Sequence, residues 1–209
     1  MPIIKSLYPK TKRLPCDGLK IQVTEKLDGS NLVIFKKNEK LYFAQRNTIF
    51  GFDEIEENKN SLYKGLYQWL IDNEPTLEIE LYEGSALCGE WLGMGKIKYD
   101  VGEFDKRFYM FAKARVTDDF TLENIMYNHD LFIYPFASQT IPKFIGIVPV
   151  VADINYLPNK QNMDKMYSTY TLGRGRAVEG FVINNNDSII KYVRYKNGQL
   201  TDHFDREDK

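Results

Sequence analysis

The chain has 209 residues, of which 43% are hydrophobic and 27% are charged, so it can build a hydrophobic core and is not intrinsically disordered. No apolar run is long enough for a membrane-spanning helix, and the first ten residues lack the apolar segment of a signal peptide. The net charge of −1 excludes a uniformly basic protein, so a nucleic-acid partner would have to bind a local basic patch.

The first half of the chain predicts a hairpin, a helix and two strands. Residues Asn31–Arg46 contain two arms rich in strand formers around the polar sequence KKNEK, which predicts a β-hairpin. Apolar side chains recur at helical spacing over Asn60–Asp72, which predicts a helix. The apolar sequences at Leu87–Leu92 and Arg107–Arg115 predict strands.

The second half predicts short helices over Thr121–Asn128 and Asn162–Tyr170, with a short apolar run at Ile145–Val151 between them. A second hairpin is predicted over Val178–Ile183 and Ser188–Tyr195, across a turn rich in asparagine. Because hairpins join most of the strands, the predicted fold class is α+β, with antiparallel sheets flanked by helices. No composition break marks a linker, so we expect one domain spanning residues 1–209.

The rare residue types exclude several kinds of site. Cys16 and Cys88 are far apart and lack metal-ligand spacing, which predicts free thiols in a reducing compartment. We therefore expect a cytoplasmic protein, and we expect a monomer. His129 and His203 are the only histidines, which argues against a zinc site or a histidine-based catalytic triad.

The sequence EKLDGSN at residues 25–31 has two interpretations. Asp-Gly is a common turn dipeptide, so Lys26 could be a solvated charge on a surface turn. Alternatively, Lys26 is a nucleophile presented on a tight turn beside groups that bind phosphate. A lysine of ordinary pKa, about 10.4, is neutral in only about 0.04% of molecules at pH 7. A nucleophilic site must therefore favour the neutral amine through nearby cations or partial burial.

Four further segments follow EKLDGSN in order: Arg46, LCGEWLG at residues 87–93, VEGFVI at 178–183 and IIKYVR at 189–194. Together they resemble the motif series of the covalent nucleotidyltransferase superfamily, which contains polynucleotide ligases and mRNA capping enzymes. The form K-x-D-G-x-N resembles the ATP-dependent RNA ligases most. The resemblance spans nearly the whole chain and implies a nucleotidyltransferase fold that uses ATP and Mg²⁺ or Mn²⁺.

The resemblance also implies roles for individual residues. Lys26 would become covalently joined to AMP, and Lys191 would contact the α-phosphate and stabilise the charge that develops on it. Glu179 would bind the divalent metal, and Glu90 would hold the ribose and contribute to the metal site. The alternative interpretation of each glutamate is an exposed side chain at a strand end.

Six further residues would contact the nucleotide or RNA: Glu25, Asp28, Asn31, Arg46, Phe111 and Arg194. Phe111 would stack on adenine, and its alternative interpretation is a core aromatic. A side-chain turn bond is the alternative for Asn31. The family often has a second lysine where this chain has Val193, so Arg194 or Lys196 would supply that charge. It also often has an aspartate where this chain has Ala112.

The expected function is that of an ATP-dependent RNA ligase, which joins an RNA 5′-phosphate to a 3′-hydroxyl. Only 15 residues follow Arg194, too few for the C-terminal OB domain of DNA ligases and capping enzymes. Two alternatives stay open: a small DNA ligase or guanylyltransferase without that domain, and a non-catalytic RNA-binding module. A local basic surface would bind the RNA backbone through Lys10, Lys12, Arg13, Arg174, Arg176 and Lys196.

Overall fold

A computed structural model describes most of the chain. The described residues are 3, 5, 7, 21–57, 63–93, 95–100, 102–127, 129–184, 189–196 and 199–204, and the side chains of 55–57, 196 and 200–204 are not described. The chain forms two compact units, each with its own sheet and its own buried core. The first unit lies within Met1–Lys10, Gly29–Gly95 and Tyr99–Ile147, and the second within Thr11–Asp28, Lys96–Lys98 and Val148–Lys209.

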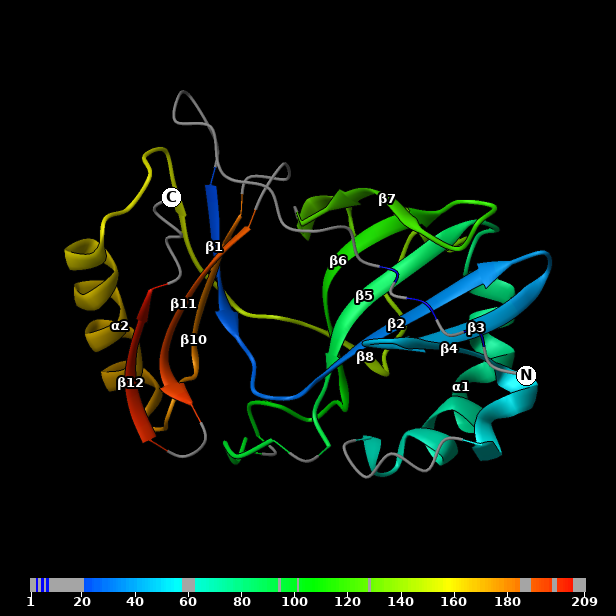
Figure 1. The fold of residues 1–209 in the computed structure, drawn as a ribbon, viewed down its shortest axis with the longest axis horizontal. Helices are drawn as coiled ribbons and strands as arrows, with labels where there is room; N and C mark the ends of the chain where they lie inside the picture. The colour runs from blue at the N-terminus through cyan, green and yellow to red at the C-terminus, as the bar shows by residue number, and fades with distance from the viewer. Residues whose placement is uncertain are drawn as a thin grey trace. The chain divides into compact units, whose positions relative to one another are not determined.

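The first unit contains a seven-stranded sheet in the order β4-β3-β2-β5-β6-β7, with β8 paired to β6 (Figure 1). The strands are β2 (Ser30–Lys37), β3 (Lys40–Gln45), β4 (Thr48–Gly51), β5 (Ser85–Trp91), β6 (Phe108–Val116), β7 (Leu122–Met126) and β8 (Ile145–Ile147). Neighbouring strands are antiparallel except for β6 and β8, which are parallel. Two 3-10 helices, Phe52–Glu57 and His129–Leu131, also belong to this unit.

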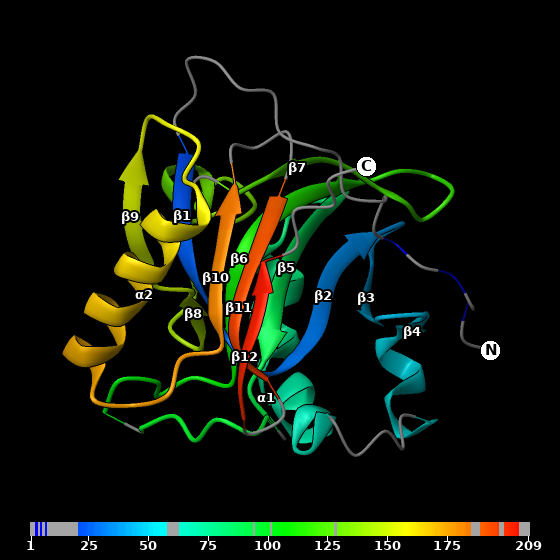
Figure 2. The same cartoon turned by 60° about the vertical axis from the view of Figure 1, so that its left-hand side comes forward.

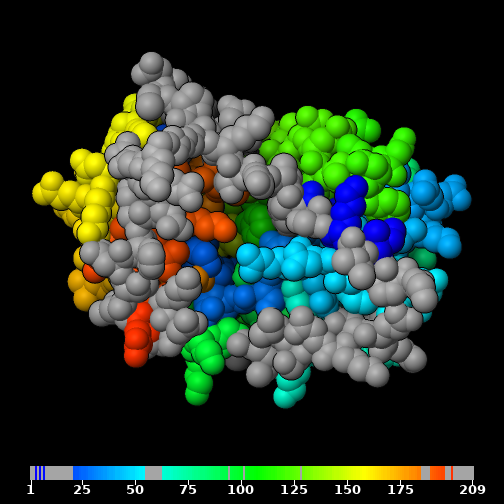
Figure 3. Space-filling model, viewed as in Figure 1, coloured from blue at the N-terminus to red at the C-terminus, as the bar shows by residue number. Residues whose placement is uncertain are grey.

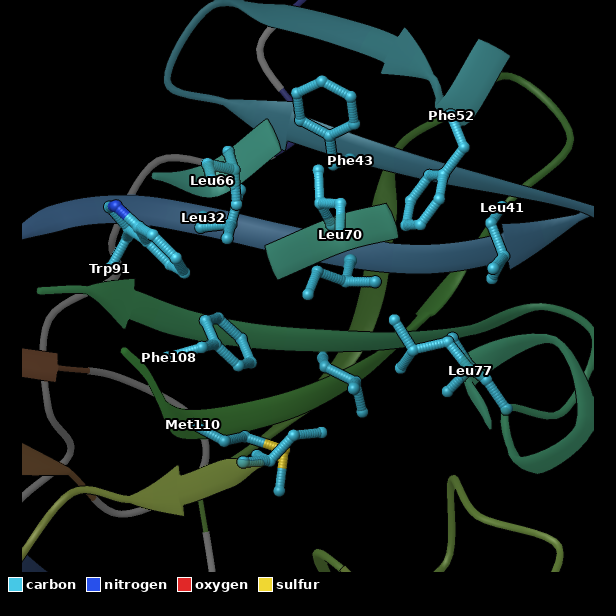
Figure 4. Close-up of a cluster of buried hydrophobic side chains, with 14 of the residues drawn as sticks. Leu32, Leu41, Phe43, Phe52, Leu66, Leu70, Leu77, Trp91, Phe108 and Met110 are labelled. Carbon is cyan, nitrogen blue, oxygen red and sulfur yellow. The ribbon is translucent and has the colours of Figure 1, made fainter. Parts of the chain in front are cut away.

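The core of the first unit lies between one face of this sheet and helix α1 (Leu66–Glu80). Figure 4 shows Leu66, Leu70 and Leu77 of the helix packed against apolar side chains of the strands. All three leucines are fully buried. The apolar face of the helix and the alternating apolar residues of the strands therefore meet in one cluster.

The second unit contains a five-stranded antiparallel sheet in the order β12-β11-β10-β1-β9. Its elements are β1 (Ile21–Lys26), β9 (Val150–Ile154), α2 (Lys160–Arg174), β10 (Gly180–Asn184), β11 (Ile189–Lys196) and β12 (Gln199–Phe204). Figures 1 and 2 show α2 alongside this sheet. Its Met163 and Tyr167 pack on Val23, Phe181 and Tyr192 of the strands, and these residues form the core of the second unit.

Both ends of α2 carry a sequence-encoded signal. At its start, the side chain of Asn159 accepts a hydrogen bond from the amide of Asn162, and the side chain of Asn162 accepts one from the amide of Asn159. This reciprocal pair is a capping box. The helix ends at Gly175, whose φ of 65° is a left-handed conformation that glycine adopts without strain. No helix among the described residues combines the length and apolar character that crossing a bilayer requires.

The structure confirms the α+β class with antiparallel sheets, both predicted hairpins and the helix that contains Asn162–Tyr170. The strands predicted at Leu87–Leu92 and Arg107–Arg115 are β5 and β6, and their ends agree within two residues. The apolar run Ile145–Val151 divides between β8 and β9. The turn of the second hairpin, residues 185–188, lies outside the described residues, as does Cys16.

The helix predicted at Asn60–Asp72 was placed wrongly. Helix α1 begins at Leu66 and continues past Pro75 to Glu80, whereas residues 58–62 lie outside the described part of the chain. A proline inside a helix removes a hydrogen bond and costs roughly 3 kcal/mol. Burial of Leu77 beyond the proline offsets part of that cost, and local pattern alone does not reveal this tertiary contact.

The short helix predicted at Thr121–Asn128 was also wrong, because Leu122–Met126 forms strand β7. The strand pairs with β6, with Lys113 opposite Met126 and Val116 opposite Leu122. Pairing with a neighbouring strand outweighs the weak local helix preference of this segment.

Helix α1 offers a matched test of the core of the first unit. Replacing Leu70, which is fully buried, with alanine should lower the free energy of unfolding by about 2–5 kcal/mol, because a cavity is left among packed side chains. The same change at Ile79, which is 76% exposed on the same helix, should have little effect. Urea denaturation followed by circular dichroism measures both. Equal losses in the two variants would contradict this packing.

Candidate active site

Lys26 is the last residue of β1, and the pairing of three strands places it on the same face as Lys191. Lys26 is opposite Gly180 of β10, which in turn is opposite Val193 of β11. Two residues away, Val182 of β10 is opposite Lys191 of β11. Because opposite residues share a face and side chains alternate along a strand, Lys26 and Lys191 lie on one face of the second unit's sheet. Lys191 is exposed, and atoms of β11 are visible at the surface in orange tones in Figure 3.

The ammonium group of Lys26 forms an ion pair with Glu179, with Nζ 2.6 Å from Oε1. The two side chains are only 22% and 13% exposed, so this pair is mostly shielded from water. The backbone of Glu179 is fixed as well, because its carbonyl oxygen accepts hydrogen bonds from the amides of both Arg194 and Tyr195. Two consecutive amides of β11 thus hold this carbonyl, at the point where the pairing of β11 with β12 shifts register.

Gly180 is needed next to Glu179 because the strands approach closely there. A Cβ at this position would lie 1.9 Å from the carbonyl oxygen of Tyr192 and 2.9 Å from the Cα of Val193. Both obstacles are backbone atoms, so no side-chain movement could relieve the clash. The glycine in VEGFVI therefore permits the close β10–β11 pairing that positions the Glu179 carboxylate.

The carboxyl group of Glu179 has a pKa raised above its ordinary value. Burial is the main cause, and the positive charges of Lys26 and Lys191 oppose it. Its second oxygen, Oε2, is buried and has no hydrogen-bond partner in the described part of the chain. A carboxylate with one free buried oxygen fits a hard divalent cation, whose preferred ligands are oxygens. Among the described residues, no group of three or more acidic, histidine or cysteine side chains could hold a metal ion.

Asp28 and Gly29 shape the chain after Lys26 in two different ways. The carboxylate of Asp28 accepts hydrogen bonds from the backbone amides of Lys96 and Ile97, the second at 2.8 Å. A Cβ at Gly29 would lie 2.5 Å from the carbonyl oxygen of Trp91 and 2.8 Å from Cγ of Glu90. Both residues of the Asp-Gly dipeptide are therefore needed: Asp28 for its hydrogen bonds to two backbone amides, and Gly29 for its close contact with Glu90 and Trp91.

Four predicted site residues belong to the first unit. Asn31 of β2 lies directly opposite Glu90 of β5, so their side chains share a face. Arg46 is exposed in the turn between β3 and β4. Phe111 is the extra residue at a bulge of β6, where the pairing with β5 shifts register, and it is half-buried. The structure thus brings Asn31 and Glu90 together within this unit.

Glu25 points to the other face of β1, toward α2. Its side chain is fully buried and binds the guanidinium of Arg176 through two hydrogen bonds of 2.7 and 2.9 Å. Tyr170 of α2 donates a third hydrogen bond to Glu25, at 2.8 Å. The carboxylate that was expected to contact the nucleotide is therefore engaged in a buried ion pair.

Arg194 also lies on the α2 side of the sheet. Its guanidinium is 3.4 Å from the carboxylate of Asp164 and 5.9 Å from the ring centroid of Tyr167, both on α2. The structure does not bring Arg194 to the face that carries Lys26 and Lys191. The side chain of Lys196 and residues Lys10, Lys12 and Arg13 of the predicted basic surface lie outside the described residues.

The sequence predicted that Arg176 belongs to a basic surface for the RNA backbone. Its side chain is 11% exposed and forms the buried pair with Glu25. The sequence also gave no indication of Tyr170, whose ring centroid lies 4.7 Å from the guanidinium of Arg174. One feature of the sequence could have shown that Glu25 faces α2. If IQVTEK is a strand, its side chains alternate between two faces, so Glu25 and Lys26 point to opposite sides.

The sequence model of the RNA ligase family matches residues 19–194, and the chain therefore belongs to this family. Comparison with the curated proteins gave no match.

Solved structures with a similar fold include several of the Naegleria gruberi RNA ligase. One with ATP and Mn has 18% identity and a TM-score of 0.53, and covers 91% of this chain and 58% of that one. A second, with AMP and Mn, has 18% identity, a TM-score of 0.52 and the same coverage. A ligand-free structure has 18% identity and a TM-score of 0.51, covering 92% and 61%. The chain thus spans about three fifths of the length of these proteins.

The Glu25–Arg176 pair generates a stability prediction. Glu25→Ala should lower the free energy of unfolding by about 3–5 kcal/mol, because it removes the carboxylate from a buried guanidinium. Asp118→Ala is the control, since it breaks the pair with Lys37 at a fully exposed carboxylate and should change stability little. Denaturant titration compares the two. A loss in Glu25→Ala no larger than in the control would show that the buried pair contributes nothing.

The raised pKa of Glu179 predicts an unusual pH dependence. Its ionised form is disfavoured in the folded protein, so its contribution to stability is present below the ordinary value of 4.5 and is lost as pH rises through the folded pKa. Glu179→Gln should therefore melt at an equal or higher temperature than the natural protein at pH 7 to 8. The difference should close as pH falls to about 4.5.

Glu80 is a control of opposite sign. Hydrogen bonds from Ser138 lower the pKa of Glu80, so its contribution is present at neutral pH and is lost as pH falls through the folded pKa. Glu80→Gln should melt lower than the natural protein at pH 7, with the gap closing in acid. Melting curves across pH test both variants, and a lower melting temperature for Glu179→Gln at pH 7 would contradict the prediction.

Proposed function

We propose that this chain is an ATP-dependent RNA ligase that joins an RNA 5′-phosphate to a 3′-hydroxyl through an AMP covalently bound to Lys26. The observation that carries the proposal is the shielded pair of Lys26 and Glu179, on a sheet face shared with Lys191. Membership of the RNA ligase family supports it. The solved Naegleria gruberi RNA ligase structures with ATP or AMP and Mn support the choice of nucleotide and divalent cation.

In the first step, the neutral amine of Lys26 attacks the α-phosphorus of ATP. A phosphorus–nitrogen bond forms, the bond to pyrophosphate breaks, and the amine loses a proton. Lys191, exposed on the same face, would contact the α-phosphate and stabilise the charge that develops on it. In the later steps, the AMP passes to the RNA 5′-phosphate and leaves when the 3′-hydroxyl attacks.

The ion pair imposes a condition on this step, because the Lys26 amine is held by the Glu179 carboxylate 2.6 Å away and is not directed at a phosphate. Glu179 must therefore be engaged elsewhere before Lys26 can attack. The free Oε2 of Glu179 makes it the residue that would hold a divalent cation. Such a cation would add positive charge near the amine and near the phosphates. Mg²⁺ and Mn²⁺ both suit an oxygen ligand set.

The first unit would supply nucleotide contacts. Glu90 and Asn31, opposite each other on β5 and β2, offer a carboxylate and an amide on one face. Arg46 offers an exposed guanidinium, which suits phosphate. Phe111, half-buried at its bulge, would offer a ring for adenine stacking.

The test is self-adenylylation of the purified protein. Incubation with labelled ATP and Mg²⁺ or Mn²⁺ should add one AMP, about 329 Da, and peptide mapping should place it on Lys26. Lys26→Ala should abolish the label. Lys37→Ala, which removes another ion-paired lysine, should label normally.

Three results would contradict the proposal. They are a label that survives in Lys26→Ala, a label from GTP or NAD in preference to ATP, and no sealing of preadenylylated RNA by a protein that labels normally. The second result would favour a guanylyltransferase or an NAD-dependent enzyme, and the third would require a different acceptor for the AMP.

A further inference from the structure

A buried tyrosine in the first unit touches the residues expected to contact the nucleotide. Tyr63 is 6% exposed, and its ring belongs to the core cluster of this unit. Its hydroxyl donates a hydrogen bond of 2.6 Å to the backbone carbonyl of Asn31. Sequence analysis found no motif at this residue, which lies just before helix α1.

Two further predicted site residues lie around the same hydroxyl. A backbone hydrogen bond from Arg46 reaches Tyr63, and the charge of Glu90 is close enough to act on it. Burial and Glu90 together raise the pKa of Tyr63 to about 12, so the hydroxyl stays protonated and remains a donor at neutral pH. Strand pairing supports this arrangement independently, because Asn31 and Glu90 are directly opposite each other on β2 and β5.

We propose that Tyr63 is a positioning residue, whose hydroxyl holds the start of β2 and the β3–β4 turn in the geometry that Asn31, Arg46 and Glu90 need to bind ATP. The inference rests on the proposed function for the identity of the ligand. The three residues come from separate elements: Asn31 and Glu90 are paired across β2 and β5, whereas Arg46 lies in the turn between β3 and β4. A single buried group that bonds two of these backbones and lies beside the third residue fixes their mutual placement.

The hydroxyl cannot be removed without consequence for its neighbours. A phenylalanine at position 63 keeps the ring in the core but leaves the Asn31 carbonyl and the Arg46 amide without this partner. The loss therefore falls on the placement of the binding residues. Tyr127 provides a matched control, because it is buried to a similar degree, 7% exposed, in the same unit.

The test measures ATP binding in the Lys26→Ala background, where no covalent step follows, by isothermal titration calorimetry. Tyr63→Phe should weaken ATP binding about tenfold or more, as loss of a buried hydrogen bond predicts. Tyr127→Phe should leave the dissociation constant within about twofold of its parent. In a cycle with Glu90→Gln, the effect of Tyr63→Phe should fall below about threefold, because both changes disturb one arrangement.

An unchanged dissociation constant in Tyr63→Phe would overturn the inference. So would full additivity with Glu90→Gln, or an equal loss in Tyr127→Phe, since each indicates a role in the core alone. Tyr63→Met, which also lacks the hydroxyl, makes the same comparison if Tyr63→Phe does not fold. Failure of the proposed function is distinguishable, because it would appear as absent labelling of Lys26 in the natural protein even where ATP binding responds to Tyr63.

Discussion

The ion pair between Lys26 and Glu179 is the interaction on which the candidate active site depends. In the proposed reaction, Lys26 would have to be held in place and shielded from bulk water, and the mostly buried carboxylate of Glu179 lies 2.6 Å from its amine. The carboxylate of Glu179 has Lys26 as a partner for one oxygen, and its other oxygen is buried without a partner among the described residues. Burial raises the pKa of this group. A buried carboxylate of this kind lowers stability, and natural proteins accept such a loss at functional sites.

The backbone geometry of the second unit positions the Lys26–Glu179 pair. Lys26 ends β1, Glu179 directly precedes β10, and Lys191 lies on β11, and these three strands are neighbours in one sheet. Gly180 permits the close approach, and the amides of Arg194 and Tyr195 hold the carbonyl of Glu179. On the opposite face, Glu25 and Arg176 form a buried pair beneath α2. Lys26 and the structural Glu25 thus lie on opposite faces of β1.

The motif residues of the candidate site could be predicted from sequence because their chemistry is written in short, ordered segments. The side to which each residue points could not, because β1 was not recognised as a strand. Once IQVTEK is a strand, the alternation of side chains puts Glu25 and Lys26 on opposite faces. Arg194 follows the same rule on β11, where it turns toward Asp164.

Other features depend on contacts distant in sequence. Nothing local marks Tyr63, whose importance comes from a bond to Asn31 across 32 positions. The continuation of α1 past Pro75 and the strand at β7 likewise follow from burial and pairing with other elements. Local patterns therefore predicted the hairpins, whereas tertiary contacts decided the helix ends and the edge of the sheet.

The central claim is that the carboxylate of Glu179 binds the amine of Lys26 in the ligand-free protein and so withholds it from reaction. Competitive labelling with acetic anhydride at pH 7.5, with exposed Lys64 as internal reference, measures the reactivity of the Lys26 amine directly. The account predicts faster labelling of Lys26 in Glu179→Gln than in the natural protein, and no change in Glu123→Gln, which alters an exposed carboxylate. Equal labelling of Lys26 with and without the Glu179 carboxylate would contradict it.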